Sequence, residues 1–144
     1  GDHRDLHSFP TRRSSDLYVS DGKDSWGVYD PVSREKIFSL IEKNHIGGVL
    51  LISGDRHGTR GFKIPRPSGF EFYEFECAGL GGRVGPDPIN SEWKTQLFGV
   101  SGEYAFGEFT FNTTLEDPTV TFRLINEKGT IYYELTLARS QITP

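Results

Sequence analysis

The sequence predicts an α/β fold that ends in an antiparallel β meander, and three features carry this prediction. Residues 30–45 place apolar side chains at the spacing of an amphipathic helix. Residues 49–53 form a short, continuous apolar run bounded by glycines, which is typical of a strand in a helix-covered sheet. Residues 103–138 hold three segments in which apolar and polar residues alternate, as expected for strands with one buried face.

The composition narrows the class of protein. Apolar residues make up 35% and charged residues 25% of the chain, and these shares are typical of a globular domain. The net charge of −4, without a basic block, argues against a nucleic-acid partner. No apolar run approaches the roughly 20 residues that span a membrane. Cys77 is the single cysteine, which excludes an internal disulfide and a cysteine-rich zinc site.

Residues 1–17 are expected to be a foreign, disordered tail. The segment His7–Leu17 resembles, at every position, the translation of a common sequencing adapter. A polar disordered tail is the alternative interpretation. We therefore exclude residues 1–17 from the fold prediction, together with His3 and His7 as candidate ligands. The natural sequence is then expected to start at Tyr18, in the interior of a longer gene product, so that residues 18–144 form the domain.

The first elements of this domain are predicted to be a loop and a helix. Residues 18–31 are rich in Asp and Gly and lead into the helix of residues 30–45. Asp30 can cap this helix, and Pro31 suits its first position. Its buried stripe is predicted to consist of Ile37, Phe38 and Ile41, and Gly47-Gly48 to end it. Its solvent side is predicted to consist of Arg34, Glu35, Glu42 and Lys43.

The remaining elements are predicted to be strands. The apolar strand of residues 49–53 is expected to be buried on both faces. Residues 61–65 and 69–79 are expected to form two more strands, with a turn near residues 67–69. Aromatic residues occupy both faces of the second of these strands, which indicates a bulge or burial on both sides. Residues 79–88 read as a glycine-rich loop. The meander is predicted to consist of strands 103–112, 119–125 and 130–138, with a hairpin turn at 126–129.

The candidate site is the segment Gly-Asp-Arg-His-Gly, which directly follows the apolar strand. Ligands of helix-covered sheets bind beyond the carboxyl ends of the strands, so Asp55 and His57 are expected at that edge. A carboxylate and an imidazole form a usual ligand pair for catalytic divalent or trivalent ions. The glycines on both sides permit sharp turns and a close approach of phosphate. The alternatives are an ordinary Gly-Asp turn and a solvated histidine.

The surroundings of this segment resemble the PhoD-like alkaline phosphatase/phosphodiesterase family, a branch of the calcineurin-like metallophosphatases. The family's pattern is Asp-x-Trp-x-x-Tyr, an Arg-bearing helix, an apolar strand and then Ser-Gly-Asp-x-His. In this sequence these are Asp24, Trp26, Tyr29, Arg34, residues 49–52, Ser53, Gly54, Asp55 and His57. Residues 72–82 are similar to the family's Tyr-Glu segment that ends in Gly-Leu. The resemblance covers most of residues 18–144.

This resemblance implies a fold, an activity and a ligand set. The fold is the C-terminal half of a four-layer α/β/β/α metallophosphatase sandwich. The activity is metal-dependent hydrolysis of phosphomonoesters or phosphodiesters, with a small molecule or a polymer as substrate. Asp55 and His57 would be metal ligands for two or more metal ions, which the resemblance suggests are iron and calcium. Family members are usually exported, to the periplasm or to the exterior.

The ligands present from Tyr18 onward are too few for such a centre. A two-metal site needs about six to eight protein ligands. His45 and His57 are the only histidines in this part of the sequence, and Asn44-His45 lies in the predicted helix. The resemblance implies that the other ligands lie in a missing N-terminal half, which is the expected partner. The chain alone is therefore expected to bind metal weakly, to be inactive or nearly so, and to expose apolar surface.

Five other residues are given non-catalytic roles. Arg56 is interpreted as a surface charge, with contact to phosphate as the alternative. His45 is interpreted as a cation at a helix end, and Cys77 as a buried strand residue outside the metal site. Trp26 and Tyr29 are interpreted as packing or substrate-rim residues.

Two other functional interpretations compete with the hydrolase. One is a non-catalytic β-rich binding module, with carbohydrate as ligand, in which residues 61–138 form a small sandwich and the Asp-x-His pair is incidental. The direction of the aromatic side chains distinguishes this binding module from the hydrolase. The alternation of apolar and polar residues turns about half of the aromatic side chains inward, which leaves few for an exposed sugar-binding platform. The other is a truncated reading frame without a function, which is compatible with the hydrolase.

Overall fold

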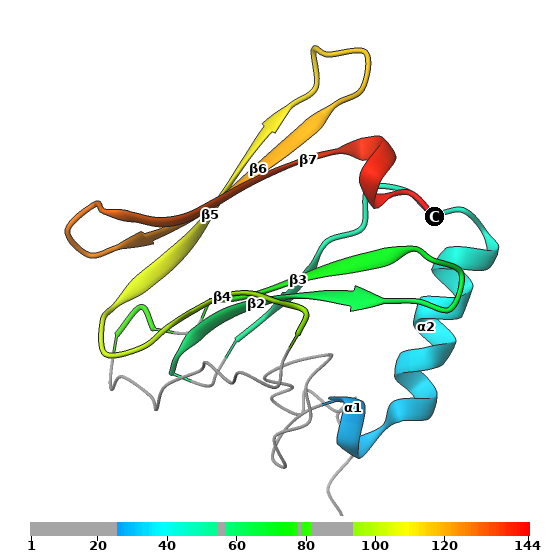
Figure 1. The fold of residues 1–144 in the computed structure, drawn as a ribbon, viewed down its shortest axis with the longest axis horizontal. Helices are drawn as coiled ribbons and strands as arrows, with labels where there is room; N and C mark the ends of the chain where they lie inside the picture. Colours follow the sequence, from blue (N-terminus) through cyan, green and yellow to red (C-terminus); the bar gives the residue numbers. More distant parts are fainter. Residues whose placement is uncertain (1–25, 55–56, 78, 82–93) are drawn as a thin grey trace, which may run out of the picture.

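The computed structural model describes residues 26–54, 57–77, 79–81 and 94–144 (Figure 1). Two helices, seven strands and a 3-10 helix follow one another in these residues, so the described part is of mixed α/β content and mostly β. The elements are α1 (Trp26–Tyr29), α2 (Pro31–Lys43), β1 (Leu51–Ser53), β2 (Thr59–Pro65), β3 (Glu71–Cys77), β4 (Gln96–Val100), β5 (Ala105–Asn112), β6 (Thr119–Asn126), β7 (Ile131–Ala138) and η1 (Arg139–Ile142). The expected tail 1–17 and most of the expected glycine-rich loop lie outside the described residues.

The helix α2 begins where the sequence predicts it. The backbone N–H of Ser33 donates to Asp30 Oδ1 at 2.9 Å, and Pro31 occupies the first helical position. The helix ends at Lys43 rather than at Gly47-Gly48, and the amide of Asn44 donates to the carbonyl of Leu40. The expected loop 18–31 is also partly wrong, because residues 26–29 form the short helix α1.

The predicted buried stripe of α2 is correct at one position and wrong at another. Phe38 is buried and stacks on Phe72 of β3, whereas 42% of Ile37 is exposed. The helix is therefore rotated from the predicted orientation, and it turns Arg34 and Glu42 partly inward. The side chains of both are only 18% exposed, so their predicted place in water is corrected.

A four-stranded sheet, with the order β1-β3-β2-β4, holds the candidate site. β1 runs parallel to β3, and β2 runs antiparallel to both β3 and β4. Gly69 has a φ of 89° in the turn that joins β2 to β3, as predicted for that segment. β1 is an edge strand and 68% of Ile52 is exposed, so the expected burial of this strand on both faces is wrong.

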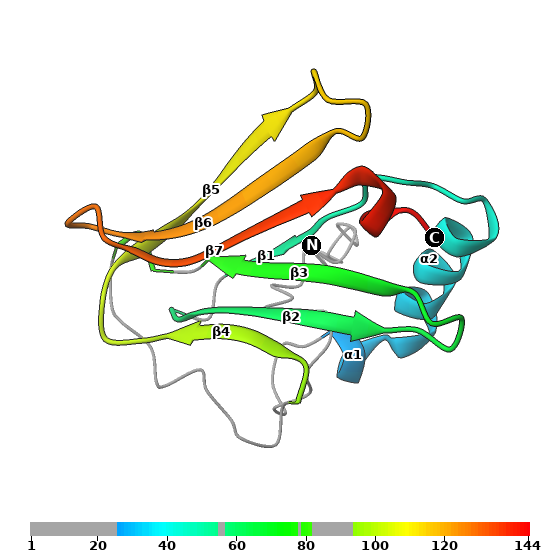
Figure 2. The same ribbon diagram turned by 45° about the horizontal axis from the view of Figure 1, so that its top comes forward.

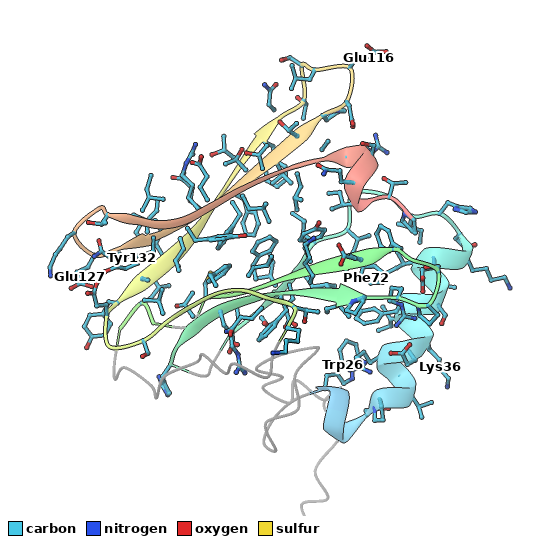
Figure 3. All side chains as sticks on the ribbon, viewed as in Figure 1. Trp26, Lys36, Phe72, Glu116, Glu127 and Tyr132 are labelled. Carbon is cyan, nitrogen blue, oxygen red and sulfur yellow. The ribbon has the colours of Figure 1, made fainter. Side chains whose placement is uncertain are left out.

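The two faces of β3 pack against different layers, as Figures 1 and 2 show. Phe72 contacts α2, whereas Tyr73 and Phe75 point into the core between the two sheets. The pairing of β2 with β3 has no register shift, so burial on both sides explains the aromatic pattern. Trp26 lies beside α2 and packs on the cluster that includes Phe72 (Figure 3).

The predicted meander is the second sheet, with the order β5-β6-β7. Its inner face packs on the first sheet through aromatic rings: Phe122 lies 4.3 Å from Phe75 and 5.5 Å from Phe98, centroid to centroid. Its outer face is polar, since Arg123 pairs with Glu108 and Glu134 across the strands. In the part of the chain that the structure describes, no helix is long and apolar enough to cross a membrane.

Candidate functional site

The candidate site lies at the edge of the four-stranded sheet where β1 and β3 end. These two strands are parallel, so Ser53 and Cys77 finish at the same edge, and the antiparallel β2 begins there with Thr59. Gly54 lies close to the end of β3, because a Cβ atom at residue 54 would be 3.6 Å from the carbonyl oxygen of Cys77. The segment between β1 and β2 therefore leaves and re-enters the sheet at its carboxyl edge.

His57 is the candidate ligand that the structure describes. It is half-buried and has a φ of 59°, in the left-handed region. That conformation costs a non-glycine residue about 1–2 kcal/mol, so the surrounding structure has to hold it. Asp55, the other predicted ligand, and Arg56 lie outside the described residues.

His45 also has a positive φ, 49°, but its position explains it. It directly follows the last turn of α2, where its N–H donates to the carbonyl of Glu42 at 3.1 Å. Left-handed residues are common at this point of a helix. Its ring nitrogen Nδ1 lies 2.9 Å from the oxygen of Pro144, so the ring contacts the C-terminal segment rather than the helix carbonyls.

Two buried carboxylates, Glu74 and Glu76, lie next to the candidate site. Their side chains are on the same face of β3 as the side chain of Phe72. Ser53, the last residue of β1, donates from Oγ to Glu74 Oε1 at 2.8 Å. Arg60, the second residue of β2, donates from Nε to Glu76 Oε2 at 2.6 Å. The side chain of Arg60 is 3% exposed and that of Glu76 is fully buried. The two strands that flank His57 are thus both bound by side chains of β3.

The sequence carries a signal for these carboxylates, although Glu74 and Glu76 were not predicted as site residues. In the run Phe72–Cys77, the glutamates alternate with Tyr73 and Phe75. A strand that is buried on both faces must bury Glu74 and Glu76 with Phe72. Buried carboxylates need partners, and the opposite positions of β2 supply Arg60.

Cys77 is a half-buried residue at the end of β3. It faces the second sheet, where a Cβ atom at Gly107 would be 2.6 Å from its Sγ. Burial raises the pKa of the Cys77 thiol to about 12, so this side chain is a neutral thiol near pH 7. The prediction of a strand residue is confirmed, but the side chain is half-buried rather than buried.

The described residues alone do not complete a metal centre. They contain no group of three or more His, Cys, Asp or Glu side chains that could hold an ion. His57 is therefore a single ligand candidate within this part of the chain. Searches against protein families, curated proteins and solved structures found no match to this chain.

Proposed function

We propose that this chain is the C-terminal part of a metal-dependent phosphoester hydrolase of the PhoD-like type. One observation carries the proposal: His57 adopts a left-handed backbone conformation at the carboxyl edge of a sheet, directly after the strand of the Ser-Gly-Asp-x-His segment. Strained backbone at such an edge is frequent at functional sites, and His57 has no helix end to explain it. The order of the surrounding sequence segments also supports this family.

The chemistry of the predicted ligands suits a metal ion, but their number does not complete a site. Carboxylate and imidazole groups suit iron and other first-row ions, and carboxylate suits calcium. Two bound ions would supply a hydroxide nucleophile and neutralise the phosphate charge. In this proposal, this chain supplies Asp55 and His57 as two of the ligands. The remaining ligands are assigned to an N-terminal half of the same enzyme.

The four-layer α/β/β/α sandwich belongs to the same proposal. Within the described residues, α2, the four-stranded sheet and the three-stranded sheet pack in that order. β1, with the exposed Ile52, is an edge strand of the sheet that the described residues form, and it is the place where strands of an N-terminal half would extend the sheet. Within the described residues, the outer face of the second sheet carries the polar ladder of Arg123, Glu108 and Glu134 and no α-helix, so this part of the chain does not supply the fourth layer of the sandwich.

A β-rich carbohydrate-binding module is the second candidate. Two packed sheets and several exposed aromatic side chains favour it, with Tyr104, Phe106, Phe111 and Tyr132 each more than a third exposed. Against it, the rings of Phe75, Phe98 and Phe122 pack between the sheets and are not accessible to a sugar. The hydroxyl of Tyr132 is also engaged, because it donates to Glu103. We therefore place this function second.

Cobalt binding followed by NMR tests the hydrolase proposal. Co²⁺ is expected to broaden the imidazole resonances of His57 in the full chain at concentrations that leave His45 unaffected. The variants His57→Gln and Asp55→Asn should weaken Co²⁺ binding. His45→Gln is the matched control, because His45 is the other histidine of the described residues with a left-handed backbone. Equal Co²⁺ binding by the parent and by His57→Gln would contradict the proposed metal site. Chemical-shift changes of Tyr104 or Phe106 on addition of cello-oligosaccharides would favour the binding module.

A further inference from the structure

We propose that Glu74 and Glu76 are positioning residues for His57: through Ser53 and Arg60 they fix both strand ends between which His57 is held. This inference depends on the proposed function in one respect only, namely that His57 binds a metal ion. The positioning itself concerns the protein without metal. It assigns a role to a buried polar cluster that the ligand set does not explain.

The polarity of one face of the β2–β3 ladder changes in the direction of His57. Farthest from His57, Ile64 pairs with Phe72, and both are apolar and buried. Next, Phe62 pairs with Glu74. At the end of the ladder that adjoins His57, Arg60 pairs with Glu76. The residues of this face are apolar where the face contacts α2. The charged residues lie at the end of the ladder that adjoins His57.

The two anchors restrain His57 from both sides in the sequence. Arg60 lies three residues after His57 in β2, a central strand whose first residues pair with both β3 and β4. Ser53 lies four residues before His57 at the end of β1, an edge strand of three residues. An edge strand this short has few backbone hydrogen bonds, so the bond from Ser53 Oγ to Glu74 Oε1, 2.8 Å, adds a restraint where the ladder is weakest.

The burial of these groups is costly and therefore needs a reason. Glu74 and Glu76 are fully buried, and Arg60 is 2% exposed. Well-packed apolar residues often replace a buried ion pair without loss of stability, and buried ionic groups can instead specify one conformation. The conformation to be specified here is the left-handed backbone of His57, φ 59°, which is uncommon for residues other than glycine.

Three variants of the full chain test this inference in the absence of metal. Ser53→Ala removes a single hydroxyl and Glu76→Gln removes a charge at nearly constant volume. Glu71→Gln is the matched control, because it breaks the ion pair with Lys63 between the same two strands at the other end of the ladder. The readouts are the imidazole and Cα chemical shifts of His57 and the hydrogen exchange of the amides of residues 57–59. A Co²⁺ titration follows for each variant.

We expect Ser53→Ala and Glu76→Gln to shift the His57 resonances and speed exchange at residues 57–59, and to weaken Co²⁺ binding about tenfold. Glu71→Gln should change neither. Unchanged His57 resonances in Ser53→Ala and in Glu76→Gln would overturn the inference, as would equal changes in the control. If His57 shifts in both variants but Co²⁺ does not bind at His57 even in the parent, the positioning role stands and the proposed function fails.

Discussion

The ring of Phe98 in β4 lies directly across Gly61 of β2, the residue with which it pairs. A Cβ atom at residue 61 would be 2.3 Å from Phe98 Cε1, closer than side chains approach. Gly61→Ala is therefore expected to destabilise the chain by about 1–3 kcal/mol, because the buried ring must move. Urea denaturation followed by circular dichroism measures this loss.

The variant Phe98→Leu provides the control for this prediction. The smaller side chain removes the ring atoms that the new methyl group would meet, so Gly61→Ala should cost less in the Phe98→Leu background. A double-mutant cycle gives the coupling between the two positions. Equal costs in both backgrounds would show that the ring does not set the requirement for glycine.

Arg66 joins the β2–β3 turn to α2. It donates to Glu35 at 2.8 Å and to Glu42 at 3.0 Å, and its guanidinium carbon lies 5.1 Å from the centre of the Phe38 ring. The side chain is only 9% exposed, so solvent screens these bonds less than on an open surface. Arg66→Met is expected to lower the free energy of unfolding by about 2 kcal/mol, since hydrogen bonds to charged partners are lost.

Lys63→Met is the matched control for Arg66→Met. It removes an ion pair from the same hairpin, but the side chains of Lys63 and Glu71 are 38% and 39% exposed. Exposed pairs contribute about 0.5 kcal/mol, so this variant should change stability little. Equal losses in the two variants would contradict a special role for Arg66 in holding α2.

The pH dependence of stability is expected to report the contact between Asp117 and Ser140. Ser140 donates to the Asp117 carboxylate from its hydroxyl at 2.6 Å and from its backbone N–H at 3.1 Å. These bonds lower the pKa of Asp117 below its usual 3.8. A lowered folded-state pKa gives stability that is complete above the unfolded pKa and is lost as the pH falls through the folded value. Asp117→Asn should thus remove stability at neutral pH and remove less of it as the pH falls below about 4.

Melting temperatures measured between neutral and acidic pH test this expectation. Glu116→Gln is the matched control, because it neutralises the adjacent exposed carboxylate of the same loop (Figure 3). A difference between the parent and Asp117→Asn that stays constant down to about pH 2.5 would contradict the assignment.

Local sequence signals predicted the elements that local chemistry decides. Asp30 and Pro31 identified the start of α2, and Gly69 and Gly129, with φ of 89° and 81°, mark turns at or next to the predicted segments. β4 was missed because its five residues include Gly99, which weakens a strand pattern, and because Phe98 is its one buried residue. The exposure of Ile52 follows from the edge position of β1, and no local pattern encodes the strand order.

The candidate site was predicted in part for the same reason. The end of an apolar strand located His57 at a sheet edge, but no pattern in the sequence predicted its left-handed backbone. Glu74 and Glu76 were missed because carboxylates normally indicate an exposed face, whereas β3 has layers on both sides.

The activity of the isolated chain is the final prediction. The described residues hold no group of three or more metal-binding side chains, whereas a two-metal centre needs about six to eight ligands. With iron, calcium or manganese added, the chain is expected to hydrolyse p-nitrophenyl phosphate and its bis-ester no faster than its Asp55→Ala variant. Turnover of about 1 s⁻¹ or more, lost in Asp55→Ala, would contradict this expectation. That result would also mean that this chain supplies a complete catalytic centre by itself, with ligands among the residues that the structure does not describe. Activity that instead appears only when an N-terminal half is added, and that again requires Asp55 and His57, is the outcome that the proposed division of ligands predicts.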